Sequence, residues 1–138
     1  MSVLYTATAH ATGDGRNGHA RSDDGILDID MRMPKAMGGP GGAPNPEMLF
    51  AAGYAACFHS ALKGVARQHK LNADGSEVTA SVGIGPLDNG GFGLTVDLSV
   101  SVPNLDTPAA EKLVAAAHEV CPYSNATRGN IPVTLTVA

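Results

Sequence analysis

The sequence contains no tryptophan, and aromatic residues make up only 4% of its 138 residues. Lysine and arginine are also scarce, with nine residues against 13 aspartates and glutamates. The resulting net charge of −4 argues against a nucleic-acid-binding protein, which would need a basic face. The chain does not begin with a basic segment followed by an apolar run, so we see no signal peptide and expect a cytoplasmic protein.

Only two cysteines occur, Cys57 and Cys121, far apart in the sequence. They could be buried thiols, a structural disulfide or a redox pair, and the absence of a secretory signal makes the structural disulfide the least favoured. The five histidines show no spacing of the HExxH type, so we predict no metal site. With 138 residues and 43% hydrophobic residues, the chain fits a single domain, residues 1–138.

One apolar stretch dominates the middle of the chain and follows Asn45-Pro46-Glu47. Asn45 is a favourable N-cap, Pro46 suits the first helical position, and the helix dipole favours Glu47 in the first turn. Residues 48–62 contain no charge and no polar face, which predicts a helix over 46–68 that is buried all round. The segment is too short for a membrane span, which needs about 20 apolar residues.

Runs of alternating residues, rich in β-branched side chains, predict strands on both sides of this helix. The expected strands are 3–9, 18–21, 26–31, 77–84, 92–102 and 131–137. A second helix is predicted over 109–120, capped by Thr107 and ended by Cys121-Pro122. The order βββ-α-ββ-α-β defines an α+β fold with mainly antiparallel sheet. The loop over 34–44 is long for a compact domain, which suggests a functional role beside the helix.

A resemblance to a known family rests on three motifs. They are Leu4-Tyr5-Thr6-Ala7, the run that begins with Asn45-Pro46-Glu47 and ends with Ala55-Ala56-Cys57-Phe58, and Cys121-Pro122-Tyr123-Ser124. With these motifs the sequence resembles the OsmC/Ohr family over nearly its whole length, and the last motif resembles its organic hydroperoxide resistance (Ohr) branch. The resemblance implies two mainly antiparallel β-sheets around a buried central helix, in an intertwined homodimer.

Cys57 lies about three turns into the predicted helix, among small neighbours that leave room beside its sulfur. An ordinary thiol of pKa about 8.5 is only a few per cent ionised at neutral pH, and nucleophilic chemistry needs the thiolate. The helix N-terminus is too distant to help, and His59 and Lys63 point to other sides of the helix. An activating cation must therefore come from elsewhere in the fold. On the residues alone, a small packing cysteine is as well supported as a reactive one.

The resemblance places the family's catalytic arginine at Arg16, in a glycine turn, and its catalytic glutamate at Glu47. Without the resemblance, a solvated turn arginine would be the favoured interpretation of Arg16. With it, Glu47 would hold the Arg16 guanidinium in a bidentate pair, and Arg16 would stabilise the Cys57 thiolate. Cys121 would be the resolving cysteine, which requires its Cα to lie about 4.4–6.8 Å from that of Cys57.

The resulting hypothesis is a thiol-dependent peroxidase for oxidative stress defence. It would reduce organic hydroperoxides, both alkyl and lipid, to alcohols through a Cys57 sulfenic acid and a Cys57–Cys121 disulfide. The resemblance implies no bound cofactor and reduction by the dihydrolipoyl group of a lipoylated protein. Glu47 and Cys57 are ten residues apart on one predicted helix, about 15 Å along its axis and on different faces. Either a kink near Gly53 or a homodimer with composite active sites would bring them together. We predict the homodimer, because a partner subunit would explain an all-buried helix and the resemblance also implies it.

Two alternatives stay open. The first is a peroxidase of the OsmC branch. The second is a non-enzymatic dimeric protein, ligand-binding or redox-sensing, in which the cysteines are structural. Tyr123 and Ser124 are assigned no role beyond shaping the site.

Overall fold

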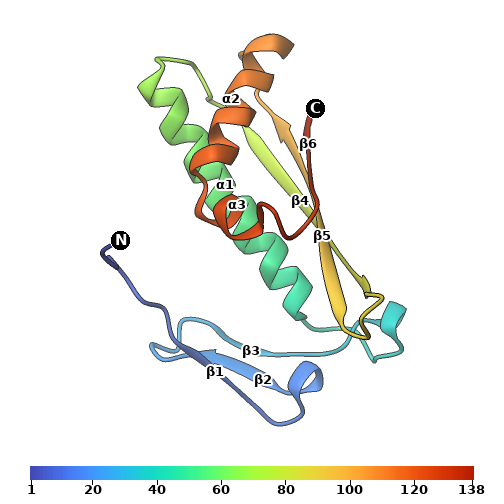
Figure 1. Ribbon diagram of the computed structural model, residues 1–138. Helices are drawn as coiled ribbons and strands as arrows, with labels where there is room; N and C mark the ends of the chain where they lie inside the picture. The colour runs from blue at the N-terminus through green and yellow to red at the C-terminus, as the bar shows by residue number, and fades with distance from the viewer. The chain divides into compact units, whose positions relative to one another are not determined.

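The computed structural model describes residues 1–138, and these form two compact units, residues 1–49 and 50–138 (Figure 1). Each unit contains one three-stranded sheet. The order of strands and helices confirms the predicted α+β fold and adds one short helix before the last strand. No helix is both long enough and apolar enough to cross a membrane. The single domain expected from the chain length stays a prediction.

The sheet of the first unit is antiparallel. It consists of β1 (Ala9–Thr12), β2 (His19–Ser22) and β3 (Asp28–Asp30), in that order. The strand predicted over 3–9 is wrong, because residues 1–8 are exposed and belong to no strand. Ala9 already pairs with Ser22, the last residue of β2, so no partner strand remains for the residues before it. Two short 3-10 helices complete the unit, η1 (Gly15–Asn17) and η2 (Lys35–Met37).

His19 joins β2 to β3 through both of its ring nitrogens. Nδ1 lies 2.9 Å from Asp30 Oδ1, and Nε2 lies 2.5 Å from Asp28 Oδ1. A ring that donates to two carboxylates must carry a proton on each nitrogen. The hydrogen bonds to Asp30 and then Asp28 raise the pKa of His19. The imidazolium therefore connects the two strands.

The hydrogen bonds of His19 predict that the stability of the β2–β3 pairing depends on pH. Because the pKa of His19 is raised on folding, its contribution to stability is complete below the unfolded pKa of about 6.5 and is lost as pH rises through the folded value. Hydrogen exchange at the β2–β3 amides should therefore speed up more steeply between about pH 6 and pH 8 than intrinsic exchange does. His19→Gln should remove that excess. An unchanged pH dependence in this variant would contradict the prediction.

The central helix α1 (Pro46–Gln68) has the predicted bounds. The backbone N–H of Met48 donates to Asn45 Oδ1 at 2.9 Å, so Asn45 caps the helix as expected. The prediction that α1 is buried all round is wrong for the single chain. One face is buried, whereas Ala52, Ala56 and Ser60 form an exposed stripe with one residue per turn. The absence of charge predicted burial on every side, but this face stays exposed because no other residue of the chain covers it.

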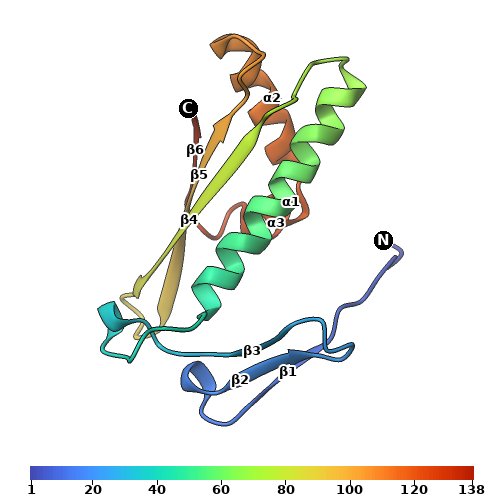
Figure 2. The same ribbon diagram turned by 180° about the vertical axis from the view of Figure 1, so that it is seen from behind.

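The sheet of the second unit consists of β4 (Glu77–Pro86), β5 (Phe92–Ser101) and β6 (Val133–Val137). β4 and β5 are antiparallel, and β6 lies parallel to β5. The helices all cover the same face of this sheet (Figure 2). The core between helices and sheet is formed by alternate residues of β5 and the apolar faces of α1 and α2: Val96, Leu98, Val100, Tyr54, Phe58, Leu62, Leu113, Val114 and Ala117.

The second helix, α2 (Thr107–Val120), begins one residue earlier than its predicted cap implies. Asp106, not Thr107, is the N-cap, because its side chain accepts the Ala109 N–H at 2.9 Å. A short helix that the sequence analysis missed, α3 (Pro122–Thr127), follows directly. Proline ends the preceding helix but also suits the first position of a new one, so Pro122 does both.

Candidate active site

Arg16 and Glu47 form a bidentate ion pair in the first unit. Arg16 Nη1 lies 2.8 Å from Glu47 Oε2, and Nη2 lies 2.8 Å from Oε1. The Glu47 side chain is only 13% exposed, and that of Arg16 is 32% exposed. Their hydrogen bonds lower the pKa of Glu47 and raise that of Arg16. Both side chains therefore stay charged, and the two parallel bonds fix the orientation of the guanidinium.

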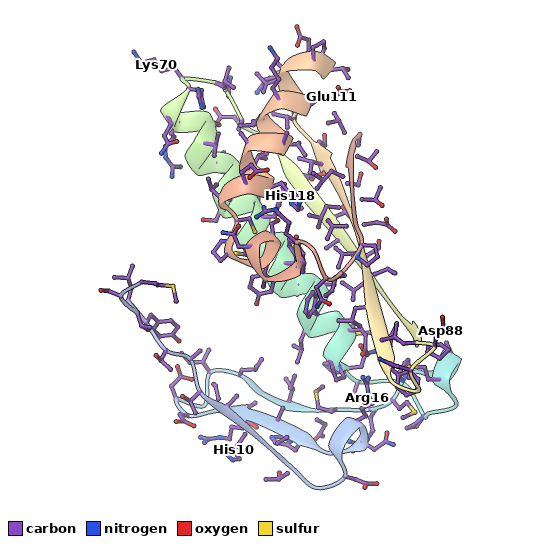
Figure 3. All side chains as sticks on the ribbon, viewed as in Figure 1. His10, Arg16, Lys70, Asp88, Glu111 and His118 are labelled. Atoms are coloured by element: carbon purple, nitrogen blue, oxygen red, sulfur yellow. The ribbon has the colours of Figure 1, made fainter.

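The turn that carries this arginine, labelled in Figure 3, is hydrogen-bonded to the segment after β3. Asn17 Oδ1 accepts the Met33 N–H at 3.0 Å, and the Arg32 guanidinium donates to the Gly18 carbonyl at 3.1 Å. The Arg32 backbone N–H donates to the Pro44 carbonyl at 3.0 Å. These bonds connect the arginine turn to the residue before the α1 cap. Neither Asn17 nor Arg32 was identified from the sequence.

Cys57 and Cys121 come together in the second unit. Their Sγ atoms are 3.8 Å apart and both are free thiols. Cys121 is fully buried between α2 and α3, whereas Cys57 on α1 is half-buried. Since a disulfide needs about 2.05 Å between the sulfurs, they have to approach by only about 1.8 Å. The sulfurs are therefore near enough for these two thiols to be the candidates for a disulfide.

The surroundings of Cys57 act on its thiol in opposite directions. Burial raises the pKa of Cys57, and the neighbouring Cys121 thiol raises it further. A hydrogen bond from the Tyr123 backbone N–H lowers the same pKa. The net direction is upward, so these contacts alone do not favour the thiolate. The Tyr123 N–H could not be found from the sequence, because every residue except proline carries a backbone N–H.

A pocket of about 330 Å³ opens beside Cys57. Besides the cysteine, its walls are formed by small and mostly apolar residues: Ser60, Ala61, Gly64, Val65, Gln68, Val120 and Pro122. The small neighbours predicted beside the sulfur thus leave real space. A pocket of this lining suits an alkyl chain whose reactive end reaches the sulfur.

α1 continues through Gly53, one turn before Cys57. A Cβ added at Gly53 would lie 2.7 Å from the Tyr123 hydroxyl and 3.2 Å from two ring carbons. The Tyr123 ring also lies 5.6 Å from the ring of Tyr54 and 6.1 Å from that of Phe50. Gly53 is therefore required for the close approach of α3, whose second residue is Tyr123.

No group of three or more His, Cys, Asp or Glu side chains is arranged to hold a metal ion. The reactive groups that the structure brings together are the two neighbouring thiols and, in the first unit, the Arg16–Glu47 ion pair. A dithiol of this kind can be oxidised in two steps, first to a sulfenic acid on one sulfur and then to a disulfide.

Comparison with known proteins agrees with the α+β fold. The model of the OsmC-like protein family matches residues 39–136, and the chain belongs to this family. Its relatives indicate the branch. The chain is 56% identical to the organic hydroperoxide resistance protein of Xanthomonas axonopodis pv. citri, over 99% of this chain and 96% of that one. It is 50% identical to the organic hydroperoxide resistance protein OhrB of Bacillus subtilis, over 96% and 97% of the two chains.

A solved structure agrees with this assignment. The crystal structure of an organic hydroperoxide resistance protein from Elizabethkingia anophelis superposes with a TM-score of 0.95 at 55% identity, covering 100% of this chain and 99% of that one. The resemblance to the Ohr branch of the OsmC/Ohr family, noted from the three sequence motifs, is thereby confirmed.

Proposed function

We propose that this protein is a thiol-dependent peroxidase that reduces organic hydroperoxides to alcohols in oxidative stress defence. The observation that carries the proposal is the 3.8 Å distance between the sulfurs of Cys57 and Cys121, with Cys57 beside an apolar pocket. The names of the relatives support the substrate class, since they are organic hydroperoxide resistance proteins. The apolar pocket lining supports alkyl and lipid hydroperoxides over hydrogen peroxide.

The reaction would begin with the Cys57 thiolate, which attacks the peroxide oxygen farther from carbon. The O–O bond breaks, a sulfenic acid forms on Cys57, and the alkoxide takes up a proton from solvent and leaves as the alcohol. The Cys121 thiol then attacks the sulfenic sulfur, and the disulfide forms with loss of water. Two electrons have passed from the sulfurs to the peroxide. A dithiol must return them, and we propose the dihydrolipoyl group of a lipoylated protein.

Arg16 and Glu47 would supply the electrostatics of the first step. The Arg16 guanidinium would stabilise the thiolate and the charge that develops on the leaving oxygen, and Glu47 would orient it. The pKa of Cys57 in its own surroundings is raised, which leaves a need for such a cation. Their ion pair is already formed with bidentate geometry, so the orientation of the guanidinium on Glu47 is fixed before any charge develops.

We further propose that the active protein is an intertwined homodimer with composite sites, in which the ion pair of one chain serves the thiols of its partner. Two observations support the dimer. Glu47 and Cys57 are about three turns apart on a helix that continues through Gly53. The exposed stripe of Ala52, Ala56 and Ser60 has side chains small enough for a second helix to approach closely.

A thiol titration tests the proposed function. Addition of an alkyl hydroperoxide to reduced protein should remove two thiols per chain within seconds, with release of one equivalent of alcohol. Dihydrolipoamide should restore both thiols faster than thioredoxin does. Hydrogen peroxide at the same concentration should react more slowly, because it makes no contact with the apolar pocket. Thiols that stay inert to the alkyl hydroperoxide would favour a binding or sensing protein with structural cysteines.

A further inference from the structure

Four buried or partly buried side chains form a continuous chain of hydrogen bonds across the three helices of the second unit. His118 Nδ1 on α2 lies 2.7 Å from Ser124 Oγ on α3. Ser124 Oγ lies 2.8 Å from the Tyr54 hydroxyl on α1, which lies 3.1 Å from Thr127 Oγ1. Tyr54, Ser124 and Thr127 are each at most 1% exposed. Figure 3 shows the labelled His118 on the last turn of α2, beside α3.

The donors in this chain can be assigned, because each hydroxyl has only one proton. Thr127 Oγ1 donates to the Ser124 carbonyl at 3.2 Å, since a carbonyl only accepts. Tyr54 must then donate to Thr127, Ser124 must donate to Tyr54, and His118 must donate through Nδ1 to Ser124. Only this direction satisfies all four bonds. Burial and the charge of Arg128 lower the pKa of His118, and the neutral Nδ1–H tautomer already supplies the donor.

The residues of this hydrogen-bond network flank both thiols. Tyr54 lies one helical turn before Cys57, and His118 and Ser124 lie three residues before and after Cys121. The hydrogen bonds therefore attach α3 to α1 at the turn next to Cys57 and attach it to α2 across Cys121. The same short helix carries Tyr123, whose backbone N–H lowers the pKa of Cys57 and whose ring packs against Gly53 and Tyr54.

We propose that Tyr54, Ser124 and His118 are positioning residues that hold α3 on α1, and thereby keep the Cys121 thiol and the Tyr123 N–H against the sulfur of Cys57. The proposal rests on the peroxidase function proposed above. The side-chain hydrogen bonds of Tyr54 and Ser124 go to each other, to Thr127 and to His118, so each acts through α3 and not on the reacting sulfurs.

The positioning role predicts a change in the fate of the sulfenic acid. A well-placed Cys121 thiol captures it as the disulfide and releases water. If Cys121 is less well placed, the sulfenic acid survives to meet a second hydroperoxide, which oxidises it to the sulfinic acid and leaves as a second alcohol. Removing a hydrogen bond of this network should therefore raise the ratio of sulfinic acid to disulfide at each hydroperoxide concentration.

Tyr54→Phe and Ser124→Ala test this in the full-length protein. Mass spectrometry after a pulse of alkyl hydroperoxide should show a ratio of sulfinic acid to disulfide about threefold or more above wild type, in line with the loss of one buried hydrogen bond. Ultraviolet titration of the thiolate should show a raised pKa of Cys57. The double variant Tyr54→Phe/Ser124→Ala removes both partners together, which leaves fewer unpaired hydroxyls and protects the fold. It should show the same increased ratio.

A matched control is available in the same unit. His59 Nε2 and Ser76 Oγ lie 2.9 Å apart, so Ser76→Ala removes an imidazole–hydroxyl hydrogen bond that does not belong to the network. This variant should keep the wild-type ratio even if its thermal stability falls. At the His118 end of the network, His118→Leu should raise the ratio of sulfinic acid to disulfide. His118→Asn should keep the wild-type ratio, because the Asn Nδ2 can donate from nearly the position of His Nδ1.

The outcomes separate the two proposals. A wild-type protein that forms neither sulfenic acid nor disulfide would refute the peroxidase function itself. If the wild type is active and both Tyr54→Phe and Ser124→Ala keep its product ratio and thiolate titration, the positioning role is wrong. An equal rise of the ratio in Ser76→Ala would also overturn it, because general loosening would then explain the effect.

Discussion

Cys57→Ser should abolish the reduction of organic hydroperoxides, whereas Cys121→Ser should still consume one equivalent per chain and then stop. The reason is that only Cys57 borders the pocket in which the substrate would lie, while Cys121 is fully buried behind it. A serine hydroxyl at position 57 is not ionised at neutral pH and cannot replace the thiolate. Stopped-flow consumption of an alkyl hydroperoxide, with alcohol release measured in parallel, checks both variants.

The products give the control for this prediction. In Cys121→Ser the sulfenic acid has no neighbouring thiol, so it should accumulate and then become sulfinic acid as more hydroperoxide is added. Oxidised wild type should instead contain a Cys57–Cys121 link within one chain, because the two sulfurs are already 3.8 Å apart. A dominant link between chains would contradict the resolving role of Cys121.

Local signals allowed the central helix to be predicted with its bounds. Asn45, Pro46 and Glu47 act through neighbouring backbone groups, and these contacts need no tertiary information. The strand predicted over 3–9 is wrong because pairing needs a partner elsewhere in the fold. Alternation shows that a segment can pair but not that a partner strand is present. The short α3 was missed since the same proline that ends α2 also begins α3.

The candidate site depended on contacts that no local pattern encodes. Arg16 and Glu47 are 31 residues apart, and Cys57 and Cys121 are 64 apart, so the resemblance to a family supplied both pairs before the structure showed their geometry. Neither spacing nor composition predicted that Ser124 would bond Tyr54 across 70 residues. Buried polar side chains take partners from whichever element packs beside them, and only the fold decides which element that is.

The exposed stripe of α1 is a feature that a single chain does not explain. A helix without charge was expected to be buried on all sides, but Ala52, Ala56 and Ser60 stay uncovered within one chain. A second copy would account for the uncharged residues on that face. Which chain supplies each site residue can then be measured with mixed dimers.

Mixing Cys57→Ser and Glu47→Ala subunits should restore about a quarter of wild-type activity if the sites are composite. Each variant alone should be nearly inactive, because every one of its sites lacks the thiol or the carboxylate. After random exchange about half of the two-fold dimers are mixed, and each mixed dimer has one doubly altered site and one intact site. Steady-state consumption of an alkyl hydroperoxide, with subunit exchange verified by mass spectrometry of tagged chains, gives the measurement.

The matched control for this mixture is Cys57→Ser with Cys121→Ser. Because the two sulfurs meet within one chain, exchange of these subunits leaves every site without one of its thiols, whichever chain supplies the ion pair. That mixture should stay at the low activity of its parents. If the Glu47→Ala mixture also stays there despite complete exchange, then Glu47 and Cys57 act within one chain. The ion pair and the thiols would then have to meet without a partner subunit, and the composite site would be wrong.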